Sequence, residues 1–301
     1  MTIGAVRSGR IEQSERVLLY GTDKIGKSSF AASAPAPIFI CPEIGTENLD
    51  IARFPEPRGW YDVLEAVATL TNDPHDYQTV VLDTVDWIEP LIWRAICTRD
   101  SKVNIEDYGY GKGYTAALDE WRLLVAALER LRAARSMRVI LLGHAIIKTW
   151  KNPTGDDFDR FALKIHDKAG GLLKEWVDAV LFVDYETFAV KDDKKRVRGV
   201  GTGARVLHTE RAAAWDAGNR YDLPPELPFS WEDFAAAMAA RRPADPARLI
   251  EAIQALAMEI GDQELSGKAA EALKKAGTNA AQLARIKDRL AAKAAQKEAS
   301  A

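Results

Sequence analysis

Two patterns of hydrophobic residues alternate along roughly the first two thirds of the chain. Short apolar runs flanked by polar or turn-forming residues predict buried β-strands at 17–20, 37–41, 79–82, 139–143 and 179–184. Between them, 60–70 and 114–135 carry apolar side chains at the spacing of one helix face. Strands that alternate with helices favour an α/β fold with a mainly parallel central sheet that is covered on both faces.

The pattern changes after Asp184. Charged and glycine-rich turns separate short β-like pieces, which predict antiparallel hairpins at the sheet edge at 187–190, 197–200 and 205–209. A proline-rich stretch then precedes apolar stripes over 249–260 and 283–290, which predict a small helical appendage. We expect three regions, namely an N-terminal arm (1–14), a core (15–241) and a C-terminal helical appendage with a frayed tail (245–301).

Composition and charge narrow the function classes only slightly. The chain of 301 residues is 47% hydrophobic and has a net charge of -3, so it should fold, and any nucleic-acid surface must be local. Cys41 and Cys97 lie far apart without a C-x-x-C pattern, which argues against a disulfide framework or a zinc site. No apolar run has the length of a signal peptide or a membrane span, so we expect a soluble, cytoplasmic protein without membrane contact.

The segment GTDKIGKSS directly follows the first predicted strand and matches the phosphate-loop pattern G-x-x-x-x-G-K-[ST]. In such a loop the backbone N–H groups cradle phosphate, the lysine reaches the β and γ oxygens, and the serine hydroxyl binds Mg²⁺. We therefore predict that ATP and Mg²⁺ bind here. The predicted nucleotide-binding residues are Gly21, Thr22, Asp23, Lys24, Ile25, Gly26, Lys27, Ser28 and Ser29.

Two carboxylates stand where a P-loop ATPase needs them. Asp83 ends the apolar run VVLD, which predicts the Walker B ligand of Mg²⁺ beside Ser28, although a strand-capping aspartate gives the same pattern. Asp86 is a weaker metal candidate, because it lies three residues into the following turn. Glu43 follows the next strand after the phosphate loop and is the candidate general base, with Glu47 as the alternative.

The order of these motifs resembles that of the RecA-type recombination ATPases, most closely the phage single-strand annealing proteins with a minimal RecA-like core. The resemblance spans 17–227 and rests on GTDKIGKSS, PEIGTENLD, VVLDTVDW, IEDYGYGKGY, VILLGH, VDAVLFVD, RVLHTE and NRYDLP. It implies a RecA-like fold with Glu43 as the catalytic glutamate. It places His144 where recombinases carry a glutamine that senses the γ-phosphate; from the residues alone, a strand-end histidine bonded to backbone is equally possible.

The resemblance also implies that 104–114 and 147–168 face single-stranded DNA in a ring or filament of identical subunits. The second segment should be a mobile polar loop without DNA. Its acidic residues nearly cancel its basic ones, so a solvated loop that does not bind DNA is the alternative. The candidate DNA-binding residues are Tyr108, Tyr110, Lys112, Lys148, Trp150, Lys151, Arg160, Lys164 and Lys168.

Arg220 is the candidate catalytic cation supplied to a neighbouring subunit. Related proteins usually carry a lysine just before N-R-x-x-L-P, where this chain has Gly218, so Arg220 would have to act alone.

The favoured function is a Mg²⁺-dependent, DNA-stimulated ATPase that promotes strand annealing or recombination as a homo-oligomer, with a single-strand binding protein as a further possible partner. The alternatives are a P-loop switch or loader that acts on a protein partner in DNA replication, and a small-molecule kinase. A GTPase is disfavoured, because the chain lacks an N-K-x-D sequence.

Overall fold

The computed structural model describes residues 13–191, 197–241, 246–260 and 263–277, with short helical pieces at 282–283, 285–287 and 289–291. The chain separates into two compact units, Met1–Ala237 and Met238–Ala301. Most of the predicted N-terminal arm and of the frayed tail lies outside the described residues, and the predicted domain limits stay a prediction.

Within the described residues, the first unit contains one ten-stranded sheet in the order β10-β8-β7-β1-β5-β4-β2-β3, with β6 paired to β5 and β9 paired to β7. The strands from β7 to β3 are parallel, whereas β6, β8, β9 and β10 pair antiparallel. The predicted α/β fold with a mainly parallel sheet and antiparallel edge strands is therefore confirmed. The strands are β1 (Arg16–Gly21), β2 (Pro37–Ile40), β3 (Ala52–Arg53), β4 (Thr79–Asp83), β5 (Arg138–Trp150), β6 (Phe158–Leu163), β7 (Ala179–Lys191), β8 (Val197–His208), β9 (Gly218–Asn219) and β10 (Glu226–Pro228).

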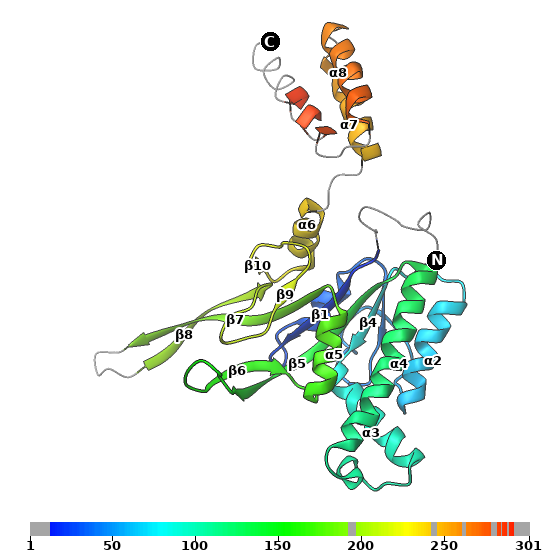
Figure 1. Ribbon diagram of the computed structural model, residues 1–301, viewed down its shortest axis with the longest axis vertical. Coiled ribbons are helices and arrows are strands. Elements are labelled where there is room, and N and C mark those ends of the chain that lie inside the picture. Colours follow the sequence, from blue (N-terminus) through cyan, green and yellow to red (C-terminus); the bar gives the residue numbers. More distant parts are fainter. Residues whose placement is uncertain are drawn as a thin grey trace. The chain divides into compact units, whose positions relative to one another are not determined.

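Helices follow most of the parallel strands and bury their apolar faces against the sheet. In Figure 1, α2 and α4 lie side by side, and they contact each other directly. Trp60 of α2 and Trp121 of α4 are each 1% exposed and share one core with Leu18, Leu82 and Leu141 of the sheet. The helices are α1 (Lys27–Ala32), α2 (Trp60–Asn72), α3 (Val85–Arg99), the 3₁₀ helix η2 (Ile105–Tyr108), α4 (Lys112–Arg135), α5 (Asp167–Trp176) and α6 (Trp231–Arg241).

Parallel register brings distant residues to one edge of the sheet. Gly21 at the end of β1 lies opposite His144 of β5, and Asp83 at the end of β4 lies opposite Leu142 of β5. We call this end of the parallel strands the carboxyl edge, and the opposite end the amino edge. Ligands of open α/β sheets bind at the carboxyl ends of the strands, so the carboxyl edge is where a functional site is expected.

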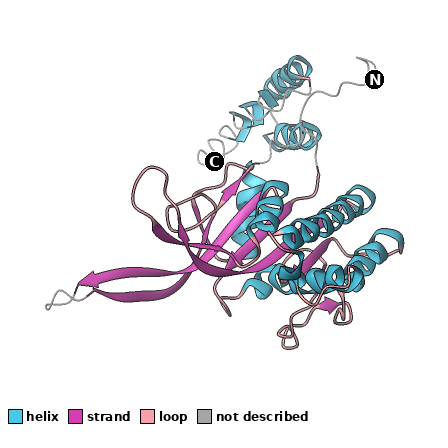
Figure 2. Ribbon diagram, turned by 60° about the horizontal axis from the view of Figure 1, so that its bottom comes forward, coloured by secondary structure: helices cyan, strands magenta, loops and turns pink. Residues whose placement is uncertain are grey.

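The prediction of a polar loop over 147–168 is wrong, whereas the mobility of this segment without DNA stays a prediction. β5 continues past His144 to Trp150 and forms a hairpin with β6, paired from Ala145 with Leu163 to Trp150 with Phe158. Residues 152–155 lie in the turn, and Arg160 and Leu163 are the buried residues of β6. A second and longer hairpin, β7–β8, extends from the sheet (Figure 2), so the short pieces expected there merge into two long strands.

The second unit contains α7 (Pro246–Ile260) and α8 (Gln263–Ala276). Leu249, Ile253 and Ile260 form its small core together with Leu283 and Leu290, as the two apolar stripes predicted. Over the described part of the chain, no helix combines the length and the apolar character that crossing a bilayer requires.

Candidate functional site

The phosphate loop connects β1 to α1 at the carboxyl edge. Gly26 has a φ of 105°, a backbone conformation that favours glycine. Lys27 follows it and is 5% exposed, and its ammonium donates to the carbonyl oxygens of Gly21 at 3.3 Å and Thr22 at 2.9 Å. Burial lowers the pKa of Lys27, although the negative charges of nearby carboxylates, Asp83 first, oppose the effect. The loop thus holds a desolvated cation among carboxylates, ready for an anionic ligand.

Asp83 and Ser28 meet at this edge as the sequence predicts. The Ser28 hydroxyl donates to Asp83 Oδ2 at 2.6 Å, and Asp83 is 4% exposed. Burial raises the pKa of Asp83, and the negative charge of Glu43 adds to the rise, despite the hydrogen bond from Ser28 and the attraction of Lys27. An additional cation would stabilise the charged form of Asp83, which burial and Glu43 disfavour.

The oxygen atoms of Ser28 and Asp83 fit Mg²⁺, which prefers hard oxygen ligands and usually takes only one or two from the protein beside substrate phosphates and water. Among the residues that the structure describes, no group of three or more His, Cys, Asp or Glu side chains is arranged to hold a metal ion by itself.

Glu43 lies beside this pair, in the loop that follows β2. Thr84 Oγ1 donates to Glu43 Oε2 at 3.2 Å and fixes one carboxylate oxygen, while the Glu43 side chain stays 28% exposed. Glu47, the alternative base, is exposed and lies farther along the loop. A carboxylate that is held by a neighbour and still reached by water has the properties of a general base.

His144 joins the site through Asp86, a contact that the sequence did not indicate. Asp86 Oδ1 accepts from the His144 backbone N–H at 3.0 Å, and Asp86 Oδ2 lies 2.9 Å from His144 Nδ1. The Asp86 hydrogen bond raises the pKa of His144 against the effects of burial and of Lys27. The other ring nitrogen, Nε2, lies 3.6 Å from Asp23 of the phosphate loop. Asp86 therefore orients the histidine.

The next turn of α3 ties the site to the segment after β6. Both oxygens of Glu89 accept from the His166 backbone N–H, at 3.0 and 3.1 Å. The His166 ring stacks on Tyr114 at 4.0 Å, and Lys168 donates to Thr115 at 2.7 Å. Burial raises the pKa of Glu89 to about 7 despite the hydrogen bond from His166. The two segments expected to face DNA are thus neighbours at the carboxyl edge.

Among the predicted DNA-binding residues, exposure varies widely. Tyr110 is fully exposed, while the Tyr108 hydroxyl donates to the Ile96 carbonyl and to Asp100. Arg160 is 6% exposed and its guanidinium faces Asp216 at 3.6 Å, so it is not accessible to a phosphate on this surface. Trp150 is 41% exposed, and the guanidinium of Arg160 lies 4.7 Å from its ring centroid. The lysines at Lys112, Lys151, Lys164 and Lys168 are exposed, and Lys148 is half-buried, with a side chain that is 38% exposed.

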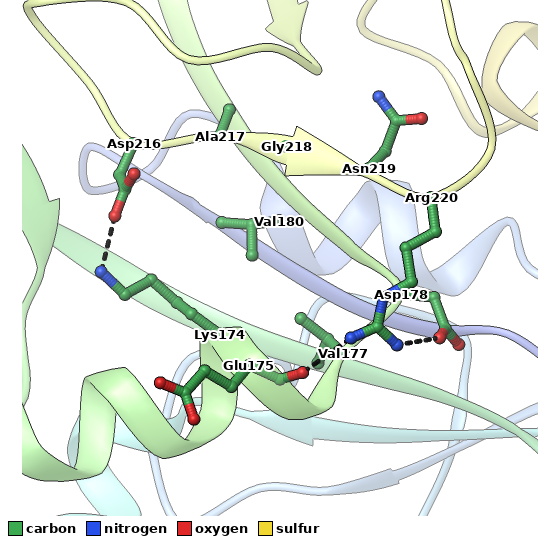
Figure 3. Close-up of a pocket in the computed structure, with 10 residues that line it drawn as sticks. All are labelled: Lys174, Glu175, Val177, Asp178, Val180, Asp216, Ala217, Gly218, Asn219 and Arg220. Atoms are coloured by element: carbon green, nitrogen blue, oxygen red, sulfur yellow. Dashed lines mark hydrogen bonds and ion pairs between the residues drawn. The ribbon is translucent and has the colours of Figure 1, made fainter.

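Arg220 lies at the amino edge, away from the phosphate loop of its own chain. Its guanidinium donates to Asp178 Oδ1 at 3.0 Å and to the Glu175 carbonyl at 2.9 Å, as Figure 3 shows, and its side chain is 58% exposed. Asp178 immediately precedes β7, whose parallel register with β1 puts it next to Arg16, at the opposite end of β1 from Gly21. Arg220 therefore belongs to a different part of the sheet than Lys27, Asp83, Glu43 and His144, which the structure brings together.

These features define a P-loop ATPase site. The sequence profile of the AAA domain family matches residues 13–221, which is more than half of the chain. The chain belongs to the AAA domain family, whose domain is a P-loop ATPase.

No curated protein matches the chain. Among solved structures, the crystal structure of the RadB recombinase matches with a TM-score of 0.40 and 13% sequence identity, over 66% of this chain and 81% of that chain. The P-loop ATPase part of the sequence interpretation is confirmed, and the narrower resemblance to phage annealing proteins stays a prediction.

Proposed function

We propose that this protein is a Mg²⁺-dependent ATPase that binds single-stranded DNA beside its nucleotide site and uses this coupling in strand annealing or recombination. One observation supports the proposal most: a single strand, β5, carries His144 at the nucleotide site and continues without a break into the β5–β6 hairpin. A movement of His144 at the γ-phosphate would be transmitted along β5 to Lys148 and to the adjoining Lys151.

The side chains at the carboxyl edge have distinct parts in hydrolysis. Lys27 and the backbone N–H groups of 21–26 bind the β and γ phosphates, and Ser28 and Asp83 would hold Mg²⁺, which would neutralise charge on the phosphate oxygens. Glu43, oriented by the hydroxyl of Thr84, accepts the proton of the attacking water.

The proposed DNA surface is the exposed part of two neighbouring segments, around Tyr110 and around the β5–β6 hairpin. Lysines such as Lys148 meet backbone phosphates, and exposed rings such as Tyr110 stack on unpaired bases. In the structure, Lys148 donates to Asp167 at 2.7 Å, and Lys151 donates to Asp157 at 2.5 Å. DNA phosphates would have to replace these exposed carboxylates, which contribute little in water.

We extend the proposal to a ring or filament in which Arg220 acts on the nucleotide of a neighbouring copy, because it lies at the amino edge of its own chain. In this assembly, Arg220→Ala protein mixed with Lys27→Ala protein regains turnover at hybrid interfaces. A single-strand binding protein is a further proposed partner.

The test of DNA binding is a salt titration with a fluorescent oligonucleotide and the Lys148→Ala/Lys151→Ala protein. The variant should bind more weakly and with a flatter salt dependence, because fewer counterions are released. The matched control is Lys274→Ala/Lys275→Ala, which removes the same charge from α8. If both double variants bind like wild type, the hairpin is not the DNA surface. If wild type binds no DNA, the alternative of an ATPase switch or loader acting on a protein partner is favoured.

A further inference from the structure

An arginine to which the sequence pattern assigned no role of its own, the first residue of RVLHTE, contacts the phosphate loop from β8, two strands away from β1. Arg205 lies on β8, and its Nη1 donates to the carbonyl oxygen of Ile25 at 2.9 Å. A Cβ atom on Gly26 would lie 2.5 Å from the same nitrogen, so the guanidinium packs directly against the loop. Arg205 and Ile25 are 180 residues apart in the sequence, and both belong to the same chain.

Aromatic rings pack against the guanidinium of Arg205. It lies 5.3 Å from the centroid of Phe229, which stacks on Phe30 of α1 at 5.2 Å with an interplanar angle of 5°. Phe30 is 4% exposed and also packs against Trp231 and Phe234 of α6. The arginine is thus the outer member of an aromatic stack that is anchored in the helix following the phosphate loop.

Arg205 is also an exposed cation with no acidic partner in the described part of the chain. Its one hydrogen bond there goes to a backbone carbonyl. A structural arginine usually has its charge compensated, as Arg16 has from Asp178 and Glu129. Arg205 keeps its charge and its planar surface available beside a nucleotide site.

Strand order shows which part of a nucleotide would meet this residue. The groups at the γ-phosphate end come from β5, β4 and β2, which lie on one side of β1, whereas Arg205 comes from β8 on the other side. A triphosphate that crosses the loop with its γ-phosphate near Glu43 has its nucleoside on the β8 side. We propose that Arg205, supported by Phe229, is the nucleoside-binding residue of this ATP site and stacks its guanidinium on the purine base in cis.

This inference rests on the ATP site of the proposed function, and it does not depend on DNA binding. Bases stack readily on arginine planes as well as on aromatic rings. The alternative role for Arg205 is mechanical, namely to hold the phosphate loop through Ile25, and the two roles differ in which ligands they affect.

The test compares two ligands, ATP and inorganic tripolyphosphate, each with Mg²⁺, by calorimetric titration of the full chain. Arg205→Ala should weaken ATP binding about tenfold while changing tripolyphosphate binding less than twofold. Arg205→Lys, which keeps the charge without the planar group, should resemble Arg205→Ala for ATP. Phe229→Leu should produce a smaller loss in the same direction. Arg122→Ala, which removes an exposed arginine from α4, is the control and should bind both ligands like wild type.

Equal weakening of ATP and tripolyphosphate binding in Arg205→Ala would show a mechanical role and overturn the proposal. Wild-type ATP affinity in either Arg205 variant would also overturn it. A thermal melt of each variant identifies loss of folding, and Arg205→Lys gives an independent answer if Arg205→Ala does not fold. Wild-type protein that binds neither ligand would contradict the ATP site itself. Wild-type protein that binds ATP but no DNA would contradict only the proposed DNA function.

Discussion

The two ends of β1 present opposite arrangements of charge. At the amino edge, every cation of the cluster has a carboxylate: the Arg16 guanidinium donates to Asp178 at 2.5 Å and to Glu129 at 2.9 Å. Arg220 shares Asp178, and Arg132 shares Glu129. Burial alone would raise the pKa of Asp178, but the hydrogen bond and charge of Arg16 lower it. This end is electrostatically complete.

The carboxyl edge has the reverse balance. The charges of Asp83 and Glu43 act on the buried Lys27, whose hydrogen bonds go to backbone carbonyls instead. The pKa of Asp83 is raised by burial, whereas that of Asp178 is lowered, although both aspartates are largely buried. The charge of Asp178 is thus compensated within the chain, whereas that of Asp83 is not, and in the proposed function Mg²⁺ and phosphate would complete the carboxyl edge.

The largest expected effect is on catalysis at the carboxyl edge. Glu43→Gln should lower the turnover of ATP by about 10²- to 10⁴-fold, because the amide cannot accept the proton of water. ATP affinity should be retained, which equilibrium titration checks. Glu47→Gln is the matched control, and a larger loss in that variant than in Glu43→Gln would move the general base to Glu47.

Removal of the buried cation comes next. Lys27→Ala should weaken ATP binding about a hundredfold, because a charge-assisted contact to phosphate in a desolvated site contributes about 2–3 kcal/mol. Calorimetric titration gives the affinity. Arg122→Ala removes an exposed cation from α4, outside the loop, and should bind ATP as wild type does. Unchanged affinity in Lys27→Ala would contradict the phosphate-loop interpretation.

At the amino edge the expected effect is on folding. Asp178→Ala should lower the free energy of unfolding by about 2 kcal/mol, because it leaves Arg16 and Arg220 without this partner. Since the folded-state pKa of Asp178 lies below its unfolded value, this contribution is present at neutral pH and is lost as pH falls through the folded pKa. Denaturant titrations should therefore give different free energies of unfolding for wild type and variant at neutral pH, and nearly equal values at acid pH. Asp119→Ala, which breaks an exposed pair on α4, should change stability by less than about 0.5 kcal/mol.

The smallest expected effect has the opposite sign. Asp83→Asn should raise the melting temperature, because a neutral amide replaces a carboxylate whose charged form is disfavoured in the folded state. The same variant should lose Mg²⁺-dependent turnover. A lower melting temperature would show that Asp83 stabilises the fold as Asp178 does, and the contrast between the two edges would then fail.

The sequence predicted the parts of the site that are carried by short contiguous patterns. Lys27, Ser28 and Asp83 follow apolar runs that could only be buried strands, and parallel pairing necessarily brings such strand ends together. Contacts between distant segments were not predictable in this way. The Asp86–His144 pair joins residues 58 apart in the sequence. Arg205 contacts Ile25 from β8, which lies in the same sheet but on the opposite side of β1 from β5.

The fold was predicted least well at 147–168, where the many polar residues were interpreted as a loop. The β5–β6 hairpin contains many charged residues, but apolar residues stand among them on each side of the turn. The signal that could have shown the hairpin was the pair of segments, AIIKTW and FDRFAL, on either side of the turn-forming residues 152–155. For α3, Pro90 inside the helix and the polar side chains of Asp86 and Glu89 concealed the helix pattern, because those side chains serve the site.

The most direct test of the account is steady-state ATP hydrolysis by the full chain with Mg²⁺, measured with and without single-stranded DNA. The account predicts basal turnover that DNA increases, since β5 links His144 to the hairpin. The Lys148→Ala/Lys151→Ala protein should keep the basal rate and lose most of the increase. Turnover that is the same with and without DNA over a range of salt concentrations would contradict the coupling of the nucleotide site to a DNA-binding surface.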